Sequence, residues 1–155
     1  MTGVGCQALL DVPMTAFFAS RQCPGTAIRA ATDWALAQAK VKQAVIGGFH
    51  SPLEQSVLTL LLQARSPVVL VLARPIAGAR LSRACVHAIG DGIMAVVSTT
   101  KNSRRLTREE AAQRNDVVTQ LASRVVIAYA SVDGDLYGQA QAWTKEGKLV
   151  ARLVD

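Results

Sequence analysis

Residues 45–55 read VIGGFHSPLEQ, and this stretch decides the fold class. A short apolar strand runs into the pair Gly47-Gly48, and a helix begins soon afterwards. Glycines let the backbone approach a ligand closely, because no Cβ is in the way. The following helix directs its N–H groups and the positive end of its dipole at the same place. The stretch therefore predicts a Rossmann-like domain that binds a nucleotide or a nucleic acid.

Strand-like and helix-like segments alternate on both sides of this stretch. The expected strands cover residues 15–19, 44–46, 68–73, 93–98, 125–130 and 149–153, and the expected helices cover residues 26–40, 52–64, 82–89, 108–123 and 135–145. Such alternation indicates βαβ units joined by right-handed crossovers. We predict an α/β fold, a single doubly wound Rossmann-like domain over residues 1–155 with a mostly parallel sheet. Residues 1–13 show no period and are expected to be an irregular lead-in.

The composition of the chain favours some classes of partner and argues against others. The chain has 17 Lys and Arg against 11 Asp and Glu, and this net charge of +6 favours an anionic partner. Cys6, Cys23 and Cys85 are scattered and form no CxxC pair, so we expect no metal and no disulfide scaffold. The GxGxxG fingerprint is absent, which argues against a dinucleotide cofactor. Without a signal-peptide pattern or a membrane-length apolar run, the chain is expected to be cytoplasmic and to have no membrane partner.

Ligands of such sheets bind beyond the carboxyl ends of the strands. Arg21 follows the first expected strand, where a guanidinium could clamp a phosphate. Asn115 lies in an apolar helix stripe, so its amide either ties down a neighbouring loop or faces the ligand. The residues expected to bind the ligand or its phosphate are Ser20, Arg21, Gly47, Gly48, Ser51, Arg114 and Asn115.

Glu54 has a structural and a functional interpretation. Ser51, Pro52 and Glu54 complete a helix capping box, which gives the Glu54 side chain a role without chemistry. The alternative makes Glu54 a base or an acceptor for a ribose hydroxyl beside a bound phosphate. The structural interpretation is preferred, because the capping pattern is complete and no second catalytic group is visible.

A basic segment precedes the helix at residues 108–123. It contains Lys101, Arg104, Arg105 and Arg108 with no acid among them, as in a loop that tracks nucleic-acid phosphates. The same run is equally typical of a solvated surface, balanced by the two glutamates that follow.

The chain resembles the DNA-processing protein A (DprA/Smf) family within the SLOG group of Rossmann-like domains. The likeness covers about residues 15–154, and its motifs, in chain order, are Ala19-Ser20-Arg21, Ile46-Gly47-Gly48, Arg114-Asn115, residues 131–134 and Gly147-Lys148. The family's Ala-Arg-Gly-Ile-Asp helix start is replaced here by residues 49–54, and its closing Pro-Gly is missing. The resemblance implies a homodimer that binds single-stranded DNA. The apolar helix at residues 52–64 also predicts a homodimer, because one sheet face would not cover it.

A second resemblance involves the replaced segment. Gly47, Gly48, Ser51 and Glu54 are similar to the Gly-Gly-x-Gly-Thr-x-x-Glu motif of the LOG phosphoribohydrolases, which would make Glu54 the catalytic carboxylate. We thus predict a nucleotide- or single-stranded-nucleic-acid-binding protein without catalysis. The alternatives are a nucleoside-monophosphate phosphoribohydrolase of the LOG kind and a sensor domain for a small nucleotide.

Overall fold

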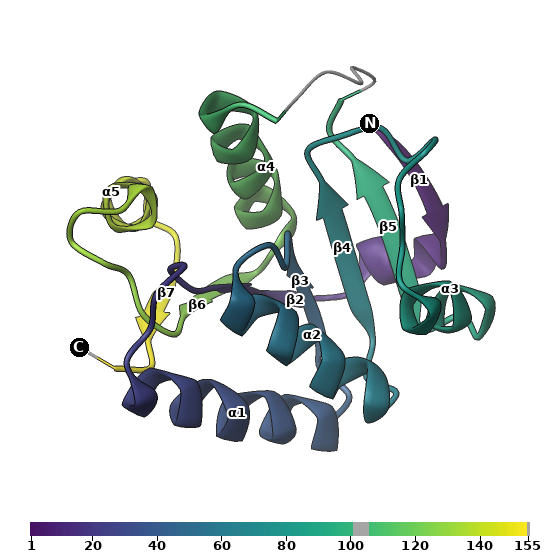
Figure 1. Ribbon diagram of the computed structural model, residues 1–155, viewed down its shortest axis with the longest axis horizontal. Coiled ribbons are helices and arrows are strands. Elements are labelled where there is room, and N and C mark those ends of the chain that lie inside the picture. Colours follow the sequence, from purple (N-terminus) through teal and green to yellow (C-terminus); the bar gives the residue numbers. More distant parts are fainter. Residues whose placement is uncertain (101–105, 155) are drawn as a thin grey trace.

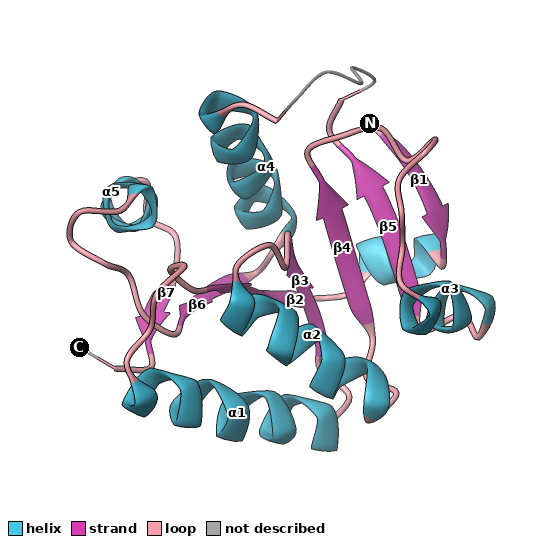
Figure 2. Cartoon of the chain, viewed as in Figure 1, coloured by secondary structure: helices cyan, strands magenta, loops and turns pink. Residues whose placement is uncertain are grey.

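All strands in the described part of the chain belong to one seven-stranded sheet (Figures 1 and 2). The computed structural model describes residues 1–100 and 106–154. The strands are β1 (Thr2–Gly5), β2 (Met14–Phe18), β3 (Ala44–Gly47), β4 (Val68–Leu72), β5 (Met94–Ser98), β6 (Arg124–Ile127) and β7 (Val150–Arg152). Their order across the sheet is β1-β5-β4-β3-β2-β6-β7, and β1 is antiparallel to β5 while the other described pairs are parallel. The predicted α/β fold with a mostly parallel sheet is confirmed.

Helices cover both faces of the sheet. They are α1 (Gly25–Lys40), α2 (Pro52–Gln63), α3 (Arg83–Gly90), α4 (Arg108–Leu121), α5 (Asp135–Lys145) and the short 3-10 helix η1 (Gln7–Asp11). Figure 1 shows α1, α2 and α3 on one side of the sheet, and α4 and α5 on the other.

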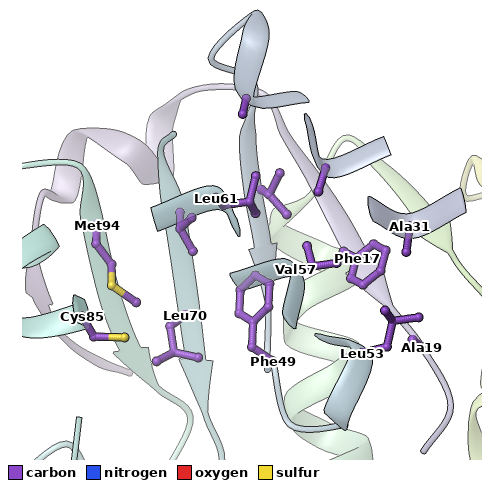
Figure 3. Close-up of a cluster of buried hydrophobic side chains, with 14 of the residues drawn as sticks. Phe17, Ala19, Ala31, Phe49, Leu53, Val57, Leu61, Leu70, Cys85 and Met94 are labelled. Carbon is purple, nitrogen blue, oxygen red and sulfur yellow. The ribbon is translucent and has the colours of Figure 1, made fainter. Parts of the chain in front are cut away.

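Successive residues of β2 build the two cores, because side chains of a strand alternate between its faces. Phe17 packs beneath α1 and α2 with Val57 and Leu61 (Figure 3). Phe18 packs on the opposite face against Trp143 of α5, with 4.9 Å between the ring centroids. The sheet is therefore doubly wound.

The direction of winding reverses at β2. The chain runs from β2 through β3 and β4 to β5 on one side, and then returns to β6 on the other side of β2. The crossovers diverge at this switch point and leave a crevice at the carboxyl ends of the strands. The loops after β2, β3 and β6 therefore meet at one edge of the sheet.

The prediction of an irregular lead-in over residues 1–13 is wrong, because this segment forms β1 and η1. β1 pairs with the edge strand β5, with Thr2 opposite Ser98. Gly5 has φ 97°, and a Cβ there would overlap the carbonyl oxygen of Met94. Two glycines in four residues weaken the intrinsic preference for a strand, so pairing with β5 rather than local sequence creates β1.

The apolar helix α2 is covered mainly within the chain. Leu53, Val57 and Leu61 are buried, and the half-buried leucines at positions 58, 60 and 62 pack against the same core. The apolar surface behind the homodimer prediction is thus largely accounted for, and the homodimer stays a prediction. Among the helices of the described residues, none combines the length and the hydropathy needed to cross a membrane.

Candidate functional site

A cleft of about 450 Å³, here called cleft A, lies at the switch point. Its walls come from the loops after β2, β3 and β6 and from the facing sides of α4 and α5. Of the residues expected at the site, cleft A brings together Ser20, Arg21, Ser51, Glu54, Arg108, Arg114 and Asn115. Gln139, Asp133 and Asp135 also line it, although the sequence analysis did not select them.

A second cleft of about 700 Å³, cleft B, opens beyond the ends of β3 and β4. Arg74, Arg80 and Arg114 line it together with leucines of α2 and β4, and its lining contains no Asp or Glu among the described residues. Arg114 and His50 line both clefts, which therefore meet at these two side chains. The sequence analysis selected Arg114 but did not list Arg74 and Arg80 among its site residues, and the only signal of these two is their crowding in the segment after β4.

Arg114 is a buried cation at the junction of the two clefts. The residue is 8 % exposed, and its Nε and Nη2 donate to Oδ1 of Asn115 over 3.3 Å each. Among the described residues it forms no ion pair. Burial lowers the pKa of the guanidinium below its ordinary value, and the nearby Glu54 carboxylate opposes this shift. Because a guanidinium stays protonated in proteins, the site holds a positive charge that Glu54 attracts without an ion-pair contact and to which an anion could bind directly.

Gly48 makes room for this guanidinium. A Cβ at Gly48 would lie 2.5 Å from Nε and 2.8 Å from Cζ of Arg114. Gly47 lines neither cleft, because the carbonyl oxygen of Phe17 and the ring of Phe49 enclose it. The left-handed backbone that ends this strand falls on Phe49, with φ 46°, and on neither glycine. Gly48 thus makes room for Arg114, and Gly47 packs against Phe17 and Phe49. The expectation that both glycines approach a phosphate stays a prediction.

We expect Gly48→Ala to displace the Arg114 side chain and to weaken binding of a phosphate-bearing ligand by roughly 10-fold or more, the scale of one lost charge-assisted hydrogen bond. Titration of a labelled single-stranded oligonucleotide would measure the change. Gly90→Ala is the matched control, because no atom lies within 4 Å of a Cβ built there. Wild-type affinity in a folded Gly48→Ala protein would rule out this role for Gly48.

Glu54 holds two loops together through its carboxylate. Its Oε2 accepts the N–H of Ala19 at 2.9 Å, and its Oε1 accepts the N–H groups of His50 and Ser51 at 2.9 and 3.0 Å. The Oγ of Ser51 accepts the N–H of Glu54 in return, so the capping box is confirmed. These backbone donors occupy both carboxylate oxygens, which favours the structural role. The hydrolase hypothesis for Glu54 stays a prediction.

Ser20 and Arg21 have different roles in the loop after β2. The Oγ of Ser20 accepts the N–H of Ser131 at 2.8 Å, and its own N–H donates to the carbonyl of Tyr129 at 2.9 Å. Ser20 therefore ties the loop after β2 to the loop after β6. Arg21 is exposed, lines cleft A and has no ion-pair partner within the described residues. Its guanidinium is available to a ligand.

Polar contacts join α4 to α5 along cleft A. The Nδ2 of Asn115 donates to Oε1 of Gln139 at 3.0 Å, while its Oδ1 accepts from Arg114. Asn115 thus orients Arg114, ties α4 to α5 rather than to a loop, and lines cleft A. Its expected role in ligand binding stays a prediction. Arg108 is paired with Asp135. The other expected nucleic-acid contacts, Lys101, Arg104 and Arg105, lie outside the described residues.

His50 was not expected at the site. Partial burial lowers the pKa of its imidazole below the ordinary value, with Arg114 the next cause. Arg21 and Arg74 act in the same direction, and Glu54 opposes them. The lowered pKa favours the neutral ring, which can accept or donate a hydrogen bond at the junction of the clefts.

The thiols lie away from any metal-ligand arrangement. Cys23 donates its thiol to the carbonyl of Ser20 at 3.2 Å, and burial, with a contribution from Glu54, raises its pKa. Within residues 1–100 and 106–154, no three His, Cys, Asp or Glu side chains gather where they could hold a metal ion.

The fold of this chain is similar to those of solved structures. DNA processing protein A from Helicobacter pylori matches 97 % of the chain at 16 % identity, with a TM-score of 0.78 and 69 % of that protein covered. The protein of the same name from Streptococcus pneumoniae matches equally, with 53 % of its length covered. The chain has the fold of DNA processing protein A. It thus spans about half the length of the second of these proteins.

More distant structures share the fold. The molybdenum cofactor carrier protein of Chlamydomonas reinhardtii matches 90 % of the chain at 12 % identity, with a TM-score of 0.62 and 75 % of that protein covered. No protein-family model matches the chain, and no curated protein matches its sequence. At these identities the likeness to DNA processing protein A shows the fold alone.

Proposed function

We propose that this protein binds single-stranded nucleic acid through clefts A and B and catalyses no reaction. The observation that carries the proposal is Arg114, whose buried guanidinium forms no ion pair among the described residues and lies where the two clefts meet. Burying a charge without an ion-pair contact is unfavourable, and a ligand phosphate would supply that contact. Arginine also binds phosphate through two parallel hydrogen bonds, which suits this position.

Other arginines extend a path on both sides of Arg114. Arg21 lies in cleft A, and Arg74 and Arg80 lie in cleft B. Cleft B is lined by leucine side chains as well as arginines, so it offers apolar surface for bases and positive charge for phosphates. A strand that follows this path would place one phosphate at Arg114. The structure of the H. pylori protein describes a single-stranded DNA binding mode, which supports the same ligand class for this fold.

A small nucleotide is the second candidate ligand. Clefts of about 450 and 700 Å³ lie in the size range of small-molecule sites. A sensor for such a ligand would use the same arginines, and the fold is shared with a cofactor carrier protein. The hydrolase alternative is supported less, because backbone N–H groups occupy the Glu54 carboxylate.

The proposal is tested by the salt dependence of oligonucleotide binding. Fluorescence anisotropy of a labelled oligothymidine should show affinity that falls with salt, and Arg21→Gln should lower the slope of log K against log salt by about 0.7, the value for one phosphate contact on a single strand. Arg29→Gln makes the same charge change on an exposed face of α1 and should leave the slope unchanged.

Two results would contradict the proposal. One is wild-type binding that does not respond to salt. The other is hydrolysis of nucleoside monophosphates by the wild-type protein, measured as the release of free base and sugar phosphate. Tight binding of a mononucleotide with no added affinity for longer oligonucleotides would favour the sensor.

A further inference from the structure

Arg108 and Asp135 form an ion pair between two helix starts. Arg108 is the first residue of α4, Asp135 is the first residue of α5, and both side chains line cleft A. The Nε of Arg108 donates to Oδ2 of Asp135 at 3.2 Å, and its Nη2 donates to Oδ1. A guanidinium uses the same two-pronged geometry to bind a phosphate. The Asp135 carboxylate therefore occupies Arg108 as a ligand phosphate would.

This ion pair is open to solvent and lies outside the core. The side chains of Arg108 and Asp135 are 82 % and 59 % exposed. Exposed pairs contribute little to folding stability, so either side chain can be substituted without a large loss of stability. The hydrogen bond from Arg108 also lowers the pKa of Asp135 below its ordinary value.

Other acids of cleft A do not act on Arg108 in this way. Glu54 is buried and accepts hydrogen bonds from backbone N–H groups of the loops after β2 and β3. Asp133 lines the cleft but forms no ion pair within the described residues. Asp135 is therefore the carboxylate placed to compete with a phosphate at this arginine.

We propose that Asp135 is a specificity-determining residue of cleft A, which withholds Arg108 from the phosphates of a bound single strand. The proposal rests on the proposed function, because it concerns the same ligand. In cleft A, Arg21 and Arg114 are then available to bind phosphates, and Arg108 is not. Asp135 therefore favours a binding path that places a phosphate at the junction of the clefts. It disfavours a path in which further phosphates pass the starts of α4 and α5.

Four proteins test this proposal by oligothymidine binding at a series of salt concentrations. Asp135→Asn should bind more tightly than the wild type, and its salt slope should rise by about 0.7, because Arg108 gains a phosphate. Arg108→Gln alone should change neither affinity nor slope by much. Combining Asp135→Asn with Arg108→Gln should return the slope to that of the wild type. The effect of Asp135→Asn on the salt slope should thus require Arg108. A merely structural role of Asp135 would not give this dependence.

Asp91→Asn is the matched control. Asp91 accepts a hydrogen bond from Arg65 at 3.0 Å and lines neither cleft, so this variant makes the same charge change on another arginine-bound aspartate. It should leave the slope unchanged. The proposal is overturned if Asp135→Asn and Asp91→Asn have the same effect, or if Arg108→Gln alone lowers the wild-type slope. If wild type and all variants fail to bind the oligonucleotide, the proposed function itself fails and this proposal fails with it.

Discussion

Arg114→Gln should weaken single-stranded oligonucleotide binding by roughly 30-fold or more. Removing one partner from a buried charge pair costs about 2 to 5 kcal/mol of binding free energy, and about 1.4 kcal/mol corresponds to a tenfold change. Glutamine keeps a polar side chain beside Asn115 but carries no charge to offer a phosphate. The affinity of a labelled oligothymidine for wild type and variant, measured at one salt concentration, gives the ratio.

The stability of the same variant should not fall with its affinity. Arg114 is buried without an ion pair in the described structure, so its removal takes away a desolvation penalty as well as packing. Thermal unfolding of Arg114→Gln should therefore occur near the wild-type temperature or above it. Arg29→Gln serves as the control for net charge, as it does for Arg21. Unchanged affinity in a stable Arg114→Gln protein would remove the observation that carries the proposed function.

Glu54→Gln should destabilise the fold by roughly 2 to 3 kcal/mol, which lowers the unfolding midpoint by about 5 to 10 °C. A capping box alone predicts little change, because glutamine also serves at its third position. The Glu54 carboxylate, however, accepts the N–H of Ala19 on one oxygen and two further N–H groups on the other. An amide has one oxygen, so its NH₂ group would face a backbone donor and leave it without an acceptor.

The second capping box of the chain is the control for Glu54. Glu110 accepts the N–H of Thr107 in an exposed setting at the start of α4. Glu110→Gln should shift the unfolding midpoint far less than Glu54→Gln, in the same calorimetric or circular dichroism experiment. Equal shifts for the two substitutions would mean that the bond to Ala19 adds nothing beyond the cap.

Much of the architecture could be predicted from the sequence. The alternation of buried strands with apolar helix stripes places each of the later elements within three residues of its observed bounds. Regular periodicity is a local property, so a local pattern reveals it. β1 escaped prediction because Gly3 and Gly5 carry no strand signal, and its existence depends on β5, about 90 residues further along the chain.

The positions of the site residues were more predictable than their roles. Loops after parallel strands converge, and Arg21 and Ser51 lie in cleft A for that reason. Their roles depend on which side chains meet across the fold. The bond from Ala19 to Glu54 spans 35 residues, and the pair of Arg108 with Asp135 spans 27. No spacing rule within one element relates such partners, so only the folded structure reveals them.

The overlap between a Cβ at position 48 and the Arg114 guanidinium constrains how this sequence can evolve. A lineage that replaces Gly48 first must displace the arginine from its position beside Asn115. A lineage that shortens Arg114 first empties the space, and position 48 can then vary freely. The two substitutions thus have a permitted order, and descendants that have lost the arginine should be the ones in which the second glycine of the pair has drifted.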